Sequence, residues 1–174
     1  MFHNLAWRGG GCFDSRRRVN STVSRTSPGC PTQPSFQIDT TLRGWRGIVP
    51  LHSTRTDVER LLGAGINKDF VSRYYLKNEN VLFHYSTGDC KSGKGAWDVP
   101  IDTVIWITIS PKPNPQLSDL KIDEGMFQKS QRGHIRDEEY YENEEGLQLT
   151  VYEGRVHTFL YGPAAKEKNL RCSK

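Results

Sequence analysis

The chain has 174 residues, of which 35% are hydrophobic and 10% aromatic, and it carries a net charge of +4. This length fits one domain with a tail, and the aromatic content excludes a fully disordered chain. The chain contains no run of about 18 apolar residues, which a membrane-spanning helix would require. The charge would favour an acidic partner, but residues 1–40 hold five Arg and two Asp, a net of +3. Residues 41–174 therefore carry only +1, with 19 basic and 18 acidic residues.

Residues 1–42 are predicted to be disordered, or to be a leader whose start is wrongly assigned. Three glycines at 9–11 precede three arginines at 16–18, and a run rich in Ser, Thr and Pro follows. The segment cannot bury enough apolar surface to offset its ordering entropy, and it lacks the apolar stretch of a secretory signal. Its arginines could bind the phosphates of a nucleic acid, which is a third hypothesis for the function. We expect residues 43–174 to form a single domain that does not bind nucleic acid.

A helix is predicted after Pro50. Thr54 and Asp57 match the pattern of a capping box, and Gly63 is placed to end the helix after nine or ten residues. The apolar residues in between follow a helical spacing and define one stripe, made of Val58, Leu61 and Leu62.

Strands are predicted beyond this helix, where the apolar pattern changes to a period of two. The ranges 70–76 and 81–85 flank a four-residue loop that would place Leu76 opposite Val81. The range 104–110 is bulky on both faces, which predicts a central strand with its three isoleucines on one face: Ile105, Ile107 and Ile109.

The second half of the chain predicts a further hairpin. The ranges 147–152 and 155–161 are joined by two residues, which places Val151 opposite Val156 and Leu147 opposite Leu160. The range 138–142 is a further strand, and 117–122 is either a short strand or a turn. The fold class is therefore α+β, with one N-terminal helix packed on an antiparallel sheet of about five to six strands.

The four cysteines include no C-x-x-C pair, so no zinc site or other metal site is predicted. Cys90 and Cys172 are predicted to form a structural disulfide that closes a loop of roughly 80 residues and stabilises the domain by about 4 kcal/mol. Such a bridge requires an oxidising compartment, whereas two free thiols would fit a cytosolic protein.

A catalytic alternative uses Cys90 as a nucleophile with His84 or His157 as its base. Six acids in nine residues could bind a cation or a basic partner, but they lack the spacing of a calcium loop. Their simpler interpretation is a charged edge strand that prevents sheets from pairing. The six are Asp137, Glu138, Glu139, Glu142, Glu144 and Glu145.

Two further features are candidate sites. The glycine-rich segment 88–95 contains Lys91 and Lys94 but lacks the spacing of a phosphate-binding loop, so no cofactor is predicted. Trp45, Arg46 and Trp97 could form a binding surface, because Trp and Arg are common anchors of interfaces. The alternative is that both tryptophans cover the ends of the sheet.

The segment from Gly44 to Leu51, with the helix motif up to Gly63 and the ends 161–164 and 170–172, resembles a family of uncharacterised bacterial envelope or secreted proteins. The helix motif is more distantly similar to the SmpA/OmlA lipoproteins and to the beta-lactamase-inhibitor-like fold. These resemblances imply a binding or assembly module and assign no catalytic residues.

The sequence therefore predicts a non-enzymatic, extracytoplasmic domain that binds a protein or an envelope component. A periplasmic or secreted location requires a signal ahead of the domain, and without one the protein would be cytoplasmic. The alternative is a small hydrolase or a ligand-binding enzyme that uses His84, Cys90 or the acidic cluster.

Overall fold

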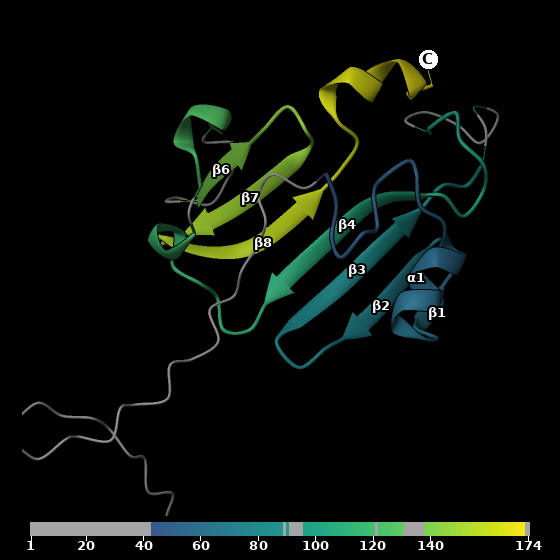
Figure 1. Ribbon diagram of the computed structural model, residues 1–174, viewed down its shortest axis with the longest axis horizontal. Helices are drawn as coiled ribbons and strands as arrows, with labels where there is room; N and C mark the ends of the chain where they lie inside the picture. The colour runs from purple at the N-terminus through teal and green to yellow at the C-terminus, as the bar shows by residue number, and fades with distance from the viewer. Residues whose placement is uncertain (1–42, 89, 91–95, 121, 131–137, 173–174) are drawn as a thin grey trace, which may run out of the picture. The chain divides into compact units, whose positions relative to one another are not determined.

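The computed structural model describes residues 43–88, 90, 96–120, 122–130 and 138–172 (Figure 1). The predicted leader, residues 1–42, lies outside this range. The described residues contain one α-helix, α1 (Arg55–Leu62), and one antiparallel sheet of eight strands in the order β1-β2-β3-β4-β8-β7-β6-β5. The strands are β1 (Ile66–Lys68), β2 (Val71–Tyr75), β3 (Glu79–Tyr85), β4 (Val104–Pro111), β5 (Gln128–Ser130), β6 (Glu138–Glu142), β7 (Leu147–Tyr152) and β8 (Arg155–Tyr161). Short 3-10 helices are η2 (Leu117–Asp119), η3 (Glu124–Met126) and η4 (Ala165–Leu170).

The predicted fold class, a helix packed on five to six strands, is wrong. The chain is mostly sheet, with eight strands in the described part and a helix of only eight residues. The strands that the sequence did not reveal are β1 and β5, which are three residues long and too short to show an alternation. No helix among the described residues is long and apolar enough to cross a membrane.

The start of α1 follows from its capping box, which confirms the prediction. The Thr54 amide donates to Asp57 Oδ2 at 2.8 Å, and the Asp57 amide donates to Thr54 Oγ1 at 3.4 Å. Gly63 ends the helix with a φ of 78°, which favours glycine. The predicted apolar stripe is only partly buried, because Val58 lies in the core whereas Leu61 is exposed.

The core lies against the inner face of the sheet. Side chains from both halves of the sheet are fully buried there, among them Phe83, Ile107, Ile109, Leu149 and Phe159. The layer that covers them is mainly irregular chain. It contains Trp45 and Ile48 from the segment before α1, Val58 from α1, and Leu117, Leu120, Ile122 and Phe127 from the connection between β4 and β5.

The hairpin of β2 and β3 is tighter than predicted. The Leu76 amide donates to the Glu79 carbonyl at 2.9 Å, so only two residues form the turn, and Tyr74 rather than Leu76 lies opposite Val81. The register is shifted by two residues, which leaves every side chain on its predicted face.

A β-bulge changes the faces of β4, which is central in the sheet as predicted. His84 pairs with Trp106 and Tyr85 with Val104, so Ile105 is the extra residue. The prediction that Ile105 shares a face with Ile107 is therefore wrong. Ile105 instead joins a second cluster with Leu51 and Trp97.

The hairpin of β7 and β8 begins as predicted, with Val151 opposite Val156. A register shift between Thr150 and Val151 follows, and Leu147 lies opposite Tyr161 rather than Leu160. An irregularity of one residue is not visible in the alternation of the sequence, which is why the prediction failed beyond it.

Candidate functional site

A tight turn before α1 presents an arginine at the surface. The backbone groups of Trp45 and Ile48 form two hydrogen bonds of 2.9 Å, and the residues between them have positive φ, 51° at Arg46 and 83° at Gly47. Two positive φ angles are typical of a type I′ turn. A Cβ at Gly44 would overlap the Ile48 carbonyl oxygen, so the turn also requires a glycine beside it.

Arg46 is held firmly in this unfavourable conformation. Its guanidinium lies 4.5 Å from the centre of the Trp45 ring, and Nη2 donates to Glu79 Oε1 at 2.6 Å. The Glu79 side chain is 4% exposed, whereas that of Arg46 is 52% exposed. A non-glycine residue with positive φ costs about 1–2 kcal/mol, and such strain is concentrated at functional sites. The contacts therefore fix a cation whose other half faces solvent.

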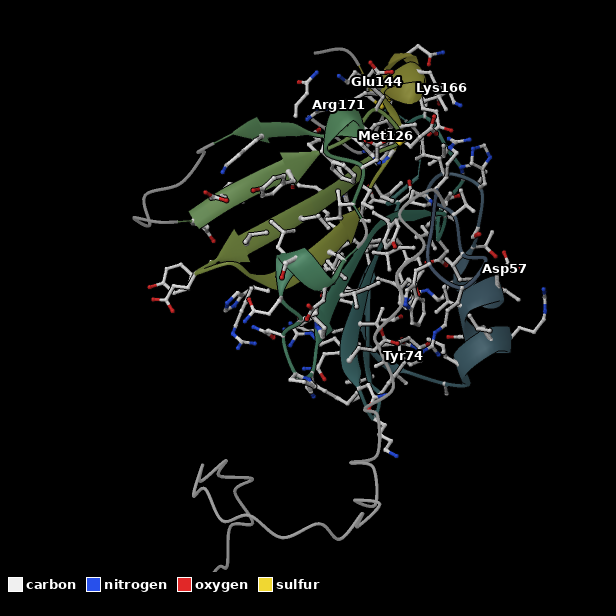
Figure 2. All side chains as sticks on the ribbon, turned by 60° about the vertical axis from the view of Figure 1, so that its left-hand side comes forward. Asp57, Tyr74, Met126, Glu144, Lys166 and Arg171 are labelled. Carbon is white, nitrogen blue, oxygen red and sulfur yellow. A yellow bond between two sulfur atoms is a disulfide. The ribbon has the colours of Figure 1, made fainter. Side chains whose placement is uncertain are left out.

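Arg46 lines an open pocket of about 500 Å³ between this turn and α1. The lining combines two guanidinium groups and an imidazole with one carboxylate, and Arg46 and Arg60 are paired with Glu79 and Asp57. Arg60 Nη1 lies 3.1 Å from Oδ1 of Asp57, which precedes it by three residues on α1. Figure 2 labels Asp57 on this helix. The lining residues are Arg46, Gly47, Ile48, His52, Ser53, Asp57, Arg60 and Leu61.

A buried carboxylate holds the histidine of this pocket. Glu167 accepts hydrogen bonds from His52 Nε2 at 2.8 Å, Arg43 Nη2 at 2.6 Å and the Ala164 amide at 2.9 Å. Burial alone would raise the pKa of Glu167, but the hydrogen bonds from Arg43 and His52 outweigh it, and the pKa lies below its usual range. Glu167 is therefore an ionised anchor for the side chains of Arg43 and His52.

The 3-10 helix that carries Glu167 is fixed to the turn between β6 and β7. The Ala165 amide donates to the Glu144 carbonyl at 2.8 Å, and Lys166 lies 3.8 Å from Glu145. Figure 2 shows Glu144 and Lys166 at this end of the molecule. The position of His52 thus depends on residues more than ninety positions away.

The serine and the histidine of the pocket have separate hydrogen-bond partners. The Ser53 hydroxyl accepts from the Val49 amide at 2.9 Å, while the His52 ring is bonded to Glu167. Nucleophilic catalysis requires a hydrogen bond between nucleophile and base, and these two side chains have different partners.

Of the three residues predicted as a binding surface, Trp45 and Arg46 are in contact, whereas Trp97 belongs to another cluster. Trp45 is buried in the main core and Trp97 in the second cluster, which leaves Arg46 as the exposed member. Sequence reasoning missed His52 and Arg60. The spacing of Arg60 from Asp57 on one helix was a local signal, whereas no local signal connects His52 with Glu167.

The Cys–His pair of the catalytic alternative does not form. Cys90 and Cys172 are joined in a disulfide with their Cα atoms 5.3 Å apart, so Cys90 carries no thiolate. His84 lies on the sheet face opposite the core, where burial and then the charge of Arg73 lower its pKa. His157 packs edge-on against the Tyr152 ring at 5.9 Å.

The acidic cluster is dispersed, and Asp137 lies outside the described residues. Glu138 accepts from the Tyr140 hydroxyl at 2.6 Å, and Glu139 lies 2.7 Å from Lys129. Among the described residues, no three His, Cys, Asp or Glu side chains could hold a metal ion together. The interpretation of β6 as an edge strand is wrong, because β5 pairs with it. Lys91 and Lys94 of the glycine-rich segment also lie outside the described residues.

Comparison with protein-family models gave no match, and comparison with curated proteins gave none. Among solved structures, the chain is similar to a DUF4309 family protein, YjgB, from Bacillus subtilis subsp. subtilis str. 168. The two share 15% identity with a TM-score of 0.45, over 66% of this chain and 81% of that one. We draw no functional conclusion from a likeness this distant.

Proposed function

We propose that this chain is a non-enzymatic, extracytoplasmic domain that binds an acidic group of a protein or an envelope component in the pocket beside α1. The observation that carries the proposal is Arg46, a half-exposed guanidinium fixed by a buried carboxylate and an aromatic ring. A preorganised arginine loses little conformational entropy on binding and can pair with a carboxylate or phosphate through two hydrogen bonds.

The extracytoplasmic location rests on the disulfide between Cys90 and Cys172, because such bonds persist in oxidising compartments. The resemblance of the segment Gly44–Leu51 to bacterial envelope or secreted proteins supports the same location. That segment forms the turn, so the resemblance and the pocket involve the same residues.

The proposal is tested by capture from a detergent extract of bacterial envelopes, with the full oxidised chain as bait. Arg46→Ala should reduce the captured component by about tenfold, the effect of losing one charge-assisted contact. Arg171→Ala removes an exposed arginine outside the pocket and serves as the matched control. Equal capture by the Arg46 variant would overturn the proposed pocket, provided that thermal unfolding shows both variants to be folded. Turnover of ester, peptide or glycoside substrates that Arg46→Ala abolishes would favour the enzyme reading instead.

A further inference from the structure

The outer face of β1 to β4, opposite the core, is a continuous surface of half-buried and exposed side chains. Cross-strand pairs place Ile66, Arg73, Leu82 and Thr108 in one row over the four strands that Figure 1 shows at one end of the sheet. Two shorter rows flank it, made of Val71, His84 and Trp106 on one side and Tyr75, Asn80 and Ser110 on the other. None of these side chains is buried.

The charged side chains that the strands place on this outer face are basic. Arg73 lies in its central row, and Lys68 and Lys112 lie at its border, all three exposed. The one carboxylate within these four strands is Glu79, which lies on the inner side and is bonded to Arg46. The outer face thus has the charge that an acidic ligand requires, although the domain as a whole is nearly neutral.

Two exposed aromatic rings stand among these cations. Tyr75 is 64% exposed, with the Lys112 ammonium 6.0 Å from its ring centre, and Trp106 is 36% exposed. Trp106 is fixed, because its ring packs edge-on against Trp97 at 6.4 Å and fills the space that a Cβ at Gly162 would occupy. The face therefore offers one fixed ring, that of Trp106, and one exposed ring, that of Tyr75.

Neutral hydrogen-bonding groups lie between the rings and the cations. Asn80, Thr108 and Ser110 occupy the outer side of β3 and β4, and each is partly exposed. The Asn80 amide oxygen accepts from Lys112 Nζ, and the Asn80 amide nitrogen and the two hydroxyls can bond to the hydroxyl groups of a sugar.

We propose that this outer face binds an acidic polysaccharide, a chain of sugar rings that carry carboxylate, sulfate or phosphate groups. The cations pair with the acidic groups, the tyrosine and tryptophan rings cover apolar faces of the sugars, and the neutral groups bond to hydroxyls. A nucleic acid fits less well, since it would need neutralisation of many phosphates, and the disulfide indicates a compartment outside the cytoplasm. The site is separate from the pocket beside α1 and does not depend on it.

The experiment measures retardation of the full oxidised chain in native gels that contain polygalacturonate. Neutral dextran is the uncharged control, and oligothymidylate is the nucleic-acid control. We expect retardation by polygalacturonate alone, and apparent affinities reduced about fivefold by Arg73→Glu and by Tyr75→Ala, as expected for one lost contact each. Lys168→Glu makes the same charge change on the exposed side of η4 and should leave the affinity unchanged.

Other outcomes overturn the proposal. If Tyr75→Ala binds as the parent does while Arg73→Glu and Lys168→Glu lose affinity equally, the interaction is general attraction to a polyanion. Stronger retardation by oligothymidylate would assign the face to nucleic acid. If the mass of the particle in solution doubles as the protein concentration rises, and Arg73→Glu prevents the doubling, the outer face binds a second copy of the chain. Arg46→Ala separates the two sites, because it should affect the pocket alone.

Discussion

The two faces of β2, β3 and β4 are made by alternate residues of the same strands, yet they differ in burial. On the inner face, Phe83, Ile107 and Ile109 have no exposed surface. On the outer face, Leu82 and Thr108 are only half-buried. Because packing does not explain the cations of the outer face or the exposed ring of Tyr75, their pattern is open to a role in binding. Changes to the inner face should therefore unfold the domain, and changes to the outer face should not.

The largest effect is expected for Phe83→Ala on the inner face. Its ring packs against Tyr74, Trp45 and Tyr85, with ring centres 5.7, 5.9 and 6.5 Å away, so truncation leaves a cavity at the centre of the core. We expect a loss of about 3–5 kcal/mol in the free energy of unfolding, measured by urea titration. Leu82→Ala, one residue earlier on the outer face, is the control and should lose about 1 kcal/mol. Equal losses would mean that the outer face is packed as the inner one is.

The second effect concerns the disulfide that ties down the chain beside Trp106. Cys90→Ser with Cys172→Ser opens a loop of 82 residues, which should lower the free energy of unfolding by up to about 4 kcal/mol. The backbone bonds from Asp98 to Leu170 and from Cys172 to Ala96 remain and keep the loss below that bound. Reductant should destabilise the parent and leave the double variant unchanged. If mass spectrometry of the purified chain shows free thiols at both cysteines, the disulfide is contradicted.

The sequence predicted which side of each long strand faces the core, except where a bulge intervenes. The alternation in β3 and the capping pattern of Thr54 and Asp57 are local, and both predictions held. The bulge at Ile105 depends on how β4 meets β3, and no local pattern encodes it. The edge strand β1 exists because β2 offers it hydrogen bonds, although its own three residues are all exposed.

The candidate site was less predictable than the fold. Arg46 was named from residue type, but its partner Glu79 lies 33 positions away, and the partner of His52 lies 115 positions away. The predicted Trp residues proved to be buried, because large aromatic side chains serve cores as often as interfaces. Only the three-dimensional structure distinguishes those roles.

A smaller effect, dependent on pH, is expected where η4 anchors His52. The lowered pKa of Glu167 means that its ionised form stabilises the folded state above the unfolded pKa near 4.5. That contribution is lost as the pH falls below 4.5 through the folded-state pKa. Glu167→Gln should cost about 1–2 kcal/mol at pH 7 and much less at pH 3. Unfolding titrations at both pH values check this, and a constant difference between parent and variant would contradict it.

The smallest effect on stability is expected for Tyr75, whose neighbour provides a matched control. Tyr74 is 6% exposed and donates from its hydroxyl to the Gly63 carbonyl at 3.1 Å, whereas Tyr75 is 64% exposed on the outer face. Tyr75→Ala should change the free energy of unfolding by less than about 0.5 kcal/mol, and Tyr74→Ala should lower it by about 3 kcal/mol or more. Thermal and urea unfolding of the two variants measure the contrast directly. A large loss for Tyr75→Ala would show that its ring is needed for folding, and any reduced polysaccharide affinity of that variant would then no longer indicate direct contact.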